Sequence, residues 1–229
     1  MLGFVAFTFQ AIGLFIFYGV LFLLAPFAIH SSMRYRLSRT SYKNVNFGYT
    51  GDLQELVLKY YGNVLLTVLT AGIYGSWMQV SIREYMLKNT WYGDAQFSYR
   101  GKGGNLFWIK VQGFFFTIFT FGIYLPWYVK NLYKFYIDNV SLHHEGLEYQ
   151  TFSDLDGGNL FSNMIINYFQ TIFTLGLGIP WIEVRNMNTF VGSVTISGDL
   201  EDLTVQQTQE QYNDAMGDDM NDLLDIGII

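Results

Sequence analysis

The chain has 229 residues, of which 51% are hydrophobic, 19% aromatic and 14% charged, whereas an average soluble domain is about a quarter charged. It contains no cysteine, which excludes a disulfide scaffold, a thiolate metal site and a cysteine nucleophile. Residues 199–229 hold nine acidic and no basic residues, and the basic residues of the remaining chain are scattered, so nucleic acid is not an expected partner.

Four apolar blocks dominate residues 1–198, at about 4–29, 60–80, 106–129 and 160–182. Each holds about 20 residues or more, the length that crosses a hydrocarbon core of about 30 Å. The first block contains no charge and is longer than the apolar region of a signal peptide. Arg34, Arg36 and Arg39 follow it, a basic collar of the kind held in the cytoplasm. The pattern therefore predicts a retained membrane segment.

The chain repeats itself. A shift of 50 residues aligns blocks two and three, and a further shift of 54 aligns blocks three and four, which is the signature of tandem structural units. The sequence Gly-Gly-Asn-Leu-Phe recurs unchanged at 103–107 and 157–161. We place the four additional residues of the last spacing between 149 and 157. The predicted units are 1–51, 52–101, 102–149 and 150–198, followed by an acidic tail at 199–229.

Each repeat also ends in a short alternating pattern typical of a strand. These patterns are Phe-Gly-Tyr at 47–49, Phe-Ser-Tyr at 97–99, Leu-Glu-Tyr at 147–149 and Val-Thr-Ile at 194–196. A strand of this length is not stable alone, so we expect the four to pair into one small sheet on one side of the membrane. Alternation predicts Phe and Tyr on one face, and Gly48, Ser98 and Glu148 on the other.

These motifs resemble the YjgN-like family of bacterial inner-membrane proteins, a domain of unknown function. The matching elements are the break motif at 120–127, Asn-Thr at 89–90, Phe-x-Tyr-x-Gly at 97–101 and the acidic segment at 217–226. The resemblance covers essentially the whole chain. Family members open with a complete strand motif, whereas Met1 lies too close to the first block for one, so we expect a shortened first repeat. The resemblance implies an architecture and a location but no biochemical activity.

The expected fold is therefore a mainly α-helical membrane protein of four repeats, each with an apolar helix, a Gly/Pro-Trp break, a short amphipathic helix and a strand. Two topologies are compatible with this pattern. Each repeat either crosses the membrane once, with an amphipathic helix in the interface, or forms a hairpin that returns to the same side. Basic residues follow both of the first two blocks, which favours the hairpin.

Polar residues within the apolar blocks are the first candidates for a functional site. A polar seam facing a substrate or water is one interpretation, and hydrogen bonding between packed helices, which we favour, is the other. The candidate seam consists of Asn63, Lys110, Gln112, Asn167 and Gln170.

The break motif is the second candidate. Interrupted helices line the substrate sites of some transporters, but a Trp at the membrane interface is typical of a plain turn, and we favour the turn. The motif residues are Gly72, Tyr74, Trp77, Gly122, Tyr124, Pro126, Trp127, Gly176, Pro180 and Trp181.

We expect no catalytic residues, no metal and no cofactor. No Gly-x-Ser-x-Gly, His-Glu-x-x-His or P-loop pattern occurs, and the adjacent His143 and His144 point in different directions on any regular element. We therefore expect a non-enzymatic, multi-pass inner-membrane protein that binds or scaffolds a membrane or cytoplasmic partner through its sheet or its acidic tail. A transporter or channel for a small solute or lipid is the alternative. The blocks two to four hold no acidic residue, which disfavours cation coupling.

Overall fold

The structure, a computed structural model, describes residues 2–198 and residue 205. The predicted acidic tail lies, apart from Val205, outside the described residues. The helices are α1 (Leu2–Ser38), α2 (Leu53–Leu69), α3 (Gly75–Lys88), α4 (Gly103–Phe119), α5 (Leu125–Asp138), α6 (Gly157–Phe173) and α7 (Ile179–Gly192). The strands are β1 (Ser41–Tyr42), β2 (Val45–Tyr49), β3 (Thr90–Tyr92), β4 (Ala95–Tyr99), β5 (Val140–His144), β6 (Leu147–Ser153) and β7 (Val194–Ile196).

The seven strands form one antiparallel sheet in which each strand pairs with its neighbours in the chain. The four strands expected from the repeat correspond to β2, β4, β6 and β7, and all four belong to this sheet. They do not pair directly in series, however, because β3 lies between β2 and β4, and β5 lies between β4 and β6. The sheet is therefore a series of β-hairpins and has more strands than the sequence predicted.

The expectation of a mainly α-helical membrane fold is wrong. The sheet of seven strands is a major part of the architecture, and within the described part of the chain only one helix, α1, is long and apolar enough to cross a membrane, over Ile16–Ser38. A signal sequence also meets that criterion. Blocks two to four are not straight helices, because each is divided by a turn into two arms.

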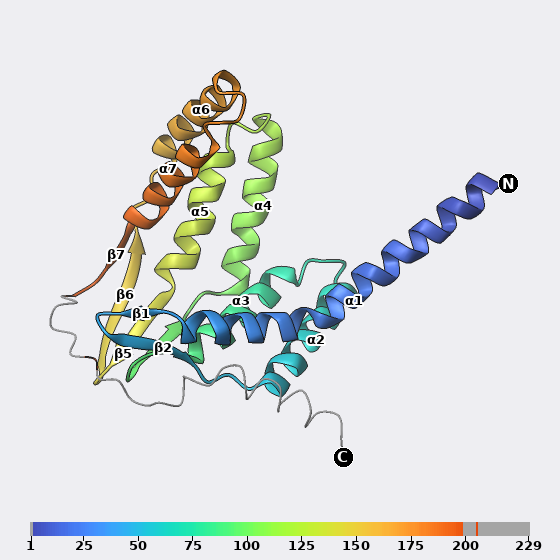
Figure 1. The fold of residues 1–229 in the computed structure, drawn as a ribbon. Coiled ribbons are helices and arrows are strands. Elements are labelled where there is room, and N and C mark those ends of the chain that lie inside the picture. The colour runs from blue at the N-terminus through green and yellow to red at the C-terminus, as the bar shows by residue number, and fades with distance from the viewer. Residues whose placement is uncertain (1, 199–204, 206–229) are drawn as a thin grey trace, which may run out of the picture.

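We call these pairs of arms the first hairpin (α2 and α3), the second hairpin (α4 and α5) and the third hairpin (α6 and α7). The first arm of each has 17 residues and the second has 14. An arm of 17 residues is about 25 Å long. The hairpins extend away from the sheet and fan apart, and α1 runs beside the first hairpin (Figure 1).

The same turn ends the first arm of every hairpin. Ala71 and Gly72 both have positive φ, of 50° and 92°, and the Gly72 N–H donates to the Thr67 carbonyl at 2.7 Å. Phe121 with Gly122, and Leu175 with Gly176, repeat this conformation within a few degrees. Only glycine adopts the left-handed region without cost, so the glycine of the break motif stops the helix and reverses the chain.

The four additional residues of the last repeat lie in the sheet, not between 149 and 157 as the sequence suggested. The N–H groups of Thr50, Arg100 and Asp154 each donate to the carbonyl of the residue that caps the end of the second arm of the following hairpin, which is Asn89, Asn139 and Ser193 in turn. Arg100 and Asp154 are 54 residues apart, so the insertion precedes Asp154. It lengthens β5 and β6 by two residues each, relative to β3 and β4.

The core forms where the strands meet the bases of the hairpins. In one cluster Tyr49 of β2 packs with Leu56, Tyr85 and Met86, against residues of α1. In the next, the equivalent Tyr99 of β4 packs with Leu106, Phe135 and Val80. The helices thus cover the Tyr face of the sheet, as alternation predicted.

Candidate functional site

The five residues of the expected polar seam do not come together in one site. Asn63 is buried inside the first hairpin, where its Nδ2 donates to the Lys59 carbonyl at 2.7 Å and to Ser81 Oγ at 3.3 Å. It therefore joins the two arms. Gln112 is exposed on α4 and makes no side-chain hydrogen bond within the described residues. The remaining three residues lie at two separate places.

Asn167 and Gln170 lie inside the third hairpin, where both accept hydrogen bonds from the guanidinium of Arg185. Arg185 of α7 donates through Nη1 to Asn167 Oδ1 at 3.1 Å and through Nη2 to Gln170 Oε1 at 2.7 Å. Asn167 also donates to Asn186 Oδ1 at 3.1 Å. Both acceptors of the guanidinium are neutral amides. Sequence reasoning missed Arg185, although it is the only Lys or Arg between 135 and 198.

Lys110 lies between hairpins. Its Nζ donates to Gln79 Oε1 of α3 at 2.7 Å, and the Tyr136 hydroxyl of α5 donates to the same oxygen at 3.1 Å. The Arg83 guanidinium lies over the Tyr136 ring, 4.8 Å from its centroid. We call Gln79, Arg83, Lys110 and Tyr136 the joint quartet. It brings two cations close to the contact between the first and second hairpins, and the sequence identified only Lys110.

The tryptophans of the break motif build the contacts between hairpins. Trp77 packs against the start of α4, where a Cβ on Gly103 would lie 2.5 Å from its indole, and its ring centroid lies 5.6 Å from that of Phe107. Trp127 repeats both contacts with Gly157 and Phe161, again at 5.6 Å between ring centroids. This explains the recurrence of Gly-Gly-Asn-Leu-Phe. No further hairpin follows Trp181 within the described residues, and Trp181 is 67% exposed.

The other break residues shape the turns. Thr70 Oγ1 accepts the N–H of Tyr74 at 3.0 Å, and Thr120 and Thr174 cap the second arms of their hairpins in the same way. Pro126 and Pro180 occupy the first turn of α5 and α7, where a missing N–H costs nothing. The break is therefore a closed turn between antiparallel arms.

Most of the chain matches a known protein family. The model of a family described as "Bacterial protein of unknown function (DUF898)" matches residues 1–118 and 147–223. The chain belongs to this family. No curated protein and no solved structure matches it.

Within this DUF898 protein, residues 119–146 lie outside the match. They form the turn and second arm of the second hairpin together with β5. This segment contributes Tyr136 to the joint quartet. The other three members of the quartet lie inside the matched region.

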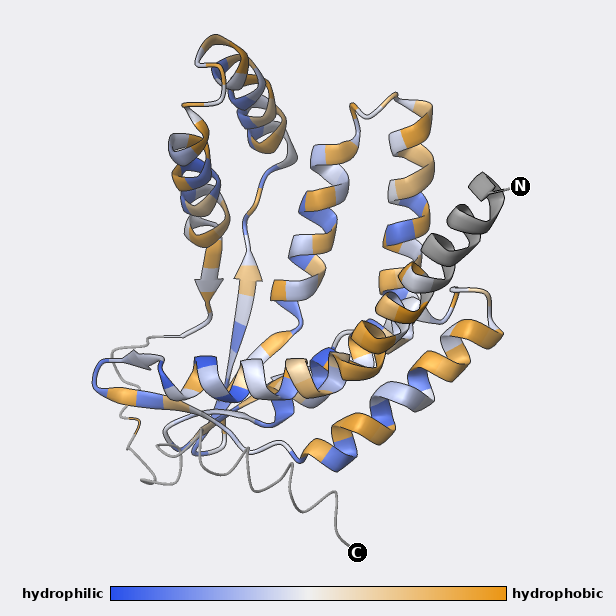
Figure 2. Cartoon of the chain, turned by 45° about the vertical axis from the view of Figure 1, so that its right-hand side comes forward, coloured by the Kyte–Doolittle hydropathy of each residue, from blue (hydrophilic) through white to orange (hydrophobic). Residues whose placement is uncertain are grey.

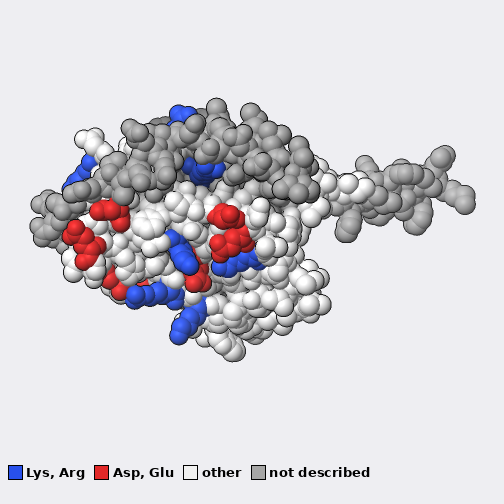
Figure 3. Space-filling view, turned by 90° about the horizontal axis from the view of Figure 1, so that it is seen from below, with Lys and Arg blue, Asp and Glu red and all other residues white. Residues whose placement is uncertain are grey.

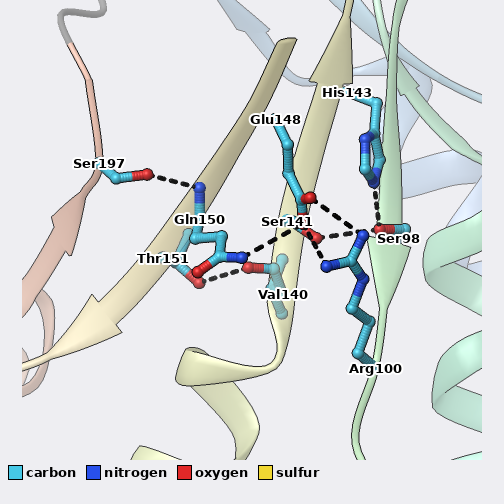
Figure 4. Close-up of polar contacts among 9 residues, drawn as sticks. All are labelled: Ser98, Arg100, Val140, Ser141, His143, Glu148, Gln150, Thr151 and Ser197. Carbon is cyan, nitrogen blue, oxygen red and sulfur yellow. Dashed lines mark hydrogen bonds and ion pairs between the residues drawn. The ribbon is translucent and has the colours of Figure 1, made fainter. Parts of the chain in front are cut away.

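The face of the DUF898 sheet opposite the helices carries a second polar group (Figure 4). Arg100 and Glu148 form a bidentate ion pair, with 2.8 Å between Nη1 and Oε1 and 3.0 Å between Nη2 and Oε2. Ser98 Oγ lies 2.8 Å from His143 Nε2. Burial raises the pKa of Glu148, but hydrogen bonds from Ser141 and Gln150 and the charge of Arg100 outweigh it and hold this pKa below its usual range. His144 points the other way, 3.2 Å from Asp94.

This polar face supplies hydrogen-bonding groups without a field of one sign. Acidic and basic side chains are interspersed on the molecular surface seen from below in Figure 3.

Proposed function

We propose that the protein is a membrane-associated binding protein and not an enzyme. In this proposal α1 crosses the bacterial inner membrane, and the tips of the three hairpins enter the bilayer from the side on which the sheet lies. The sheet then presents its polar face to a partner in the cytoplasm. The hairpins enter and return, so only α1 crosses.

The observation that carries the proposal is the exposure of apolar side chains at the hairpin tips. Phe121 is 99% exposed, Leu175 91% and Phe173 82%. The tips are also free of charge, because residues 60–82, 111–129 and 157–182 contain no Asp, Glu, Lys or Arg. Apolar residues colour the ends of the hairpins in Figure 2. A soluble monomer rarely exposes apolar patches beyond a few hundred Å².

The backbone of the turns is compatible with an apolar medium. Lipid offers no hydrogen bonds, so polar groups of the chain must be satisfied internally. At the first tip the Gly72 N–H is bonded to Thr67 and the Tyr74 N–H to the Thr70 hydroxyl. Arms of about 25 Å are shorter than a hydrocarbon core of about 30 Å. Entry and return on one side fit these dimensions.

The orientation follows from the basic residues at the sheet end of α1. Arg34, Arg36 and Arg39 precede β1 directly, and Lys and Arg next to a membrane segment are retained in the cytoplasm. This supports a cytoplasmic location for the sheet. Transport of a solute is less well supported, because the groove between the first two hairpins is open at the side, where Phe114 and Phe115 are exposed.

The chain has no cysteine, so single labelling sites test the proposal. A fluorophore on Phe173→Cys, at a tip, should be quenched by lipids that carry a nitroxide on the acyl chain. Leu147→Cys is the matched control, because Leu147 is an equally apolar residue that is exposed on the sheet. Equal quenching at both positions, or quenching at neither, contradicts insertion of the tips.

A further inference from the structure

The contact between the first two hairpins has an internal counterpart. The shifts of 50 and 54 residues carry Gln79, Lys110 and Tyr136 onto Val129, Met164 and Phe190. The two sets line or adjoin equivalent grooves, of about 390 Å³ between the first and second hairpins and about 230 Å³ between the second and third. Every polar group of the first set is replaced by an apolar one in the second.

The fourth member of the joint quartet follows the same rule. Arg83 corresponds to Tyr133. Its position over the Tyr136 ring, 4.8 Å from the centroid, corresponds to the tilted contact of the Tyr133 and Phe190 rings, whose centroids are 5.0 Å apart. The second contact therefore has the same packing without any charge. Packing of two hairpins does not require Gln79, Arg83 or Lys110.

The two cations of the quartet also lack an anion. Lys110 bonds to the neutral amide of Gln79, and Arg83 lies over the rings of Tyr99 and Tyr136. Arg83 Nε is buried without a hydrogen-bond partner. Within the described residues no carboxylate forms an ion pair with either side chain. A partly buried cation is costly unless it is paired, so the quartet is suited to an anionic ligand.

The groove beside the quartet determines the kind of anion. Gln79 and Lys110 form its polar part, whereas Phe107, Phe114 and Phe115 make most of the rest apolar. We propose that this groove binds an anionic phospholipid, with the phosphate at the Lys110 ammonium and an acyl chain along the phenylalanines. Arg83 adds a second positive charge beside the headgroup. The inference rests on the proposed membrane association, which brings the groove into contact with lipid.

The test is a titration of the full chain in a nonionic detergent with dioctanoyl phosphatidylglycerol and dioctanoyl phosphatidylcholine. The wild type should bind the phosphatidylglycerol about tenfold or more tightly than the phosphatidylcholine, because one charge-assisted hydrogen bond contributes about that much to the affinity. The triple variant Gln79→Val, Lys110→Met, Tyr136→Phe gives the first contact the residues of the second. It should remain folded and lose the preference. Lys102→Met is the control, because it removes an equal charge from a residue whose side chain makes no capping bond. This variant should retain the preference for the anionic lipid.

Three results would overturn the inference. The first is equal affinity of the wild type for both lipids. The second is an unchanged preference for the anionic lipid in the triple variant. If the triple variant unfolds, Lys110→Met alone replaces it in this comparison. The third is equally tight binding of free glycerol phosphate, which indicates a soluble anion instead of a lipid. Because this titration uses detergent, its outcome does not depend on insertion of the tips, and the quenching experiment does not depend on the quartet.

Discussion

Replacing Gly103 by Ala should destabilise the protein, because this glycine is where the second hairpin meets Trp77. A Cβ at position 103 would lie 2.5 Å from the indole of Trp77 and 2.8 Å from its Cα. The indole can be displaced, but the Cα of Trp77 belongs to α3 and moves only with the helix. Overpacking of this kind costs about 1–3 kcal/mol.

The neighbouring glycine supplies the control. A Cβ on Gly104 meets nothing within 4 Å, so Gly104→Ala keeps the contact and gains about 0.5–1 kcal/mol from lower backbone entropy in the unfolded chain. The two variants should therefore differ by about 1.5–4 kcal/mol. Gly157→Ala should behave like Gly103→Ala, because its Cβ would lie 2.5 Å from Trp127.

The assay is thermal unfolding in one detergent, followed by circular dichroism for the wild type and each variant. Gly103→Ala should lower the midpoint, and Gly104→Ala should leave it unchanged or raise it. Equal midpoints for these two variants would refute the contact of Trp77 with the start of α4 as an element of stability.

Four further changes test other parts of the structure. Tyr85→Phe should cost about 0.5–1.5 kcal/mol in thermal unfolding, because the Tyr85 hydroxyl donates to the Asp52 carbonyl at 2.6 Å. Tyr99→Phe should cost no stability, because the Tyr99 hydroxyl is buried without a hydrogen-bond partner. Burial raises the pKa of Tyr99 to about 12, against the lowering effect of Arg83, so this hydroxyl stays neutral. An equal loss of stability in Tyr85→Phe and Tyr99→Phe would contradict this. Glu148→Gln should lower the unfolding midpoint slightly at neutral pH, since a pKa lowered in the folded state gives stability that is present above the unfolded pKa and lost as pH falls through the folded one. The midpoints of this variant and the wild type should converge at acid pH, and a constant difference across the titration would be the contrary result. Thr120→Val should cost about 1 kcal/mol by removing the acceptor of the Tyr124 N–H, and an unchanged midpoint would show that the cap is dispensable.

The repeat made part of the fold predictable. The alternation at 47–49 and 97–99 identified β2 and β4, and the glycine of each break motif identified the turns. The strands β1, β3 and β5 were missed. β1 has two residues and β3 has three, and both β3 and β5 begin two residues after the end of a helix. Counting apolar residues also gave blocks long enough to cross a membrane, since hydropathy does not register that Gly72 reverses the chain halfway.

The candidate site was less predictable. Lys110 was identified because a charge in an apolar block is conspicuous, but Gln79, Arg83 and Tyr136 come from the second arms of two hairpins, whose proximity depends on how the hairpins pack. One signal was available in the sequence. The repeat aligns Tyr136 with Phe190 and Lys110 with Met164, and loss of polar groups at equivalent positions marks the first contact as different.

In the proposed arrangement the hairpins enter the bilayer from the side of the sheet and do not cross it. An impermeant thiol reagent, applied to either side of membrane vesicles, tests this arrangement at three single cysteines. Two replace exposed residues of the sheet, Thr50 after β2 and Glu145 between β5 and β6, and the third replaces Phe121 at a tip. Thr50→Cys and Glu145→Cys should be labelled from the cytoplasmic side alone, and Phe121→Cys from neither side. Labelling of the two sheet positions from opposite sides, or of Phe121→Cys from the periplasmic side, would contradict the account.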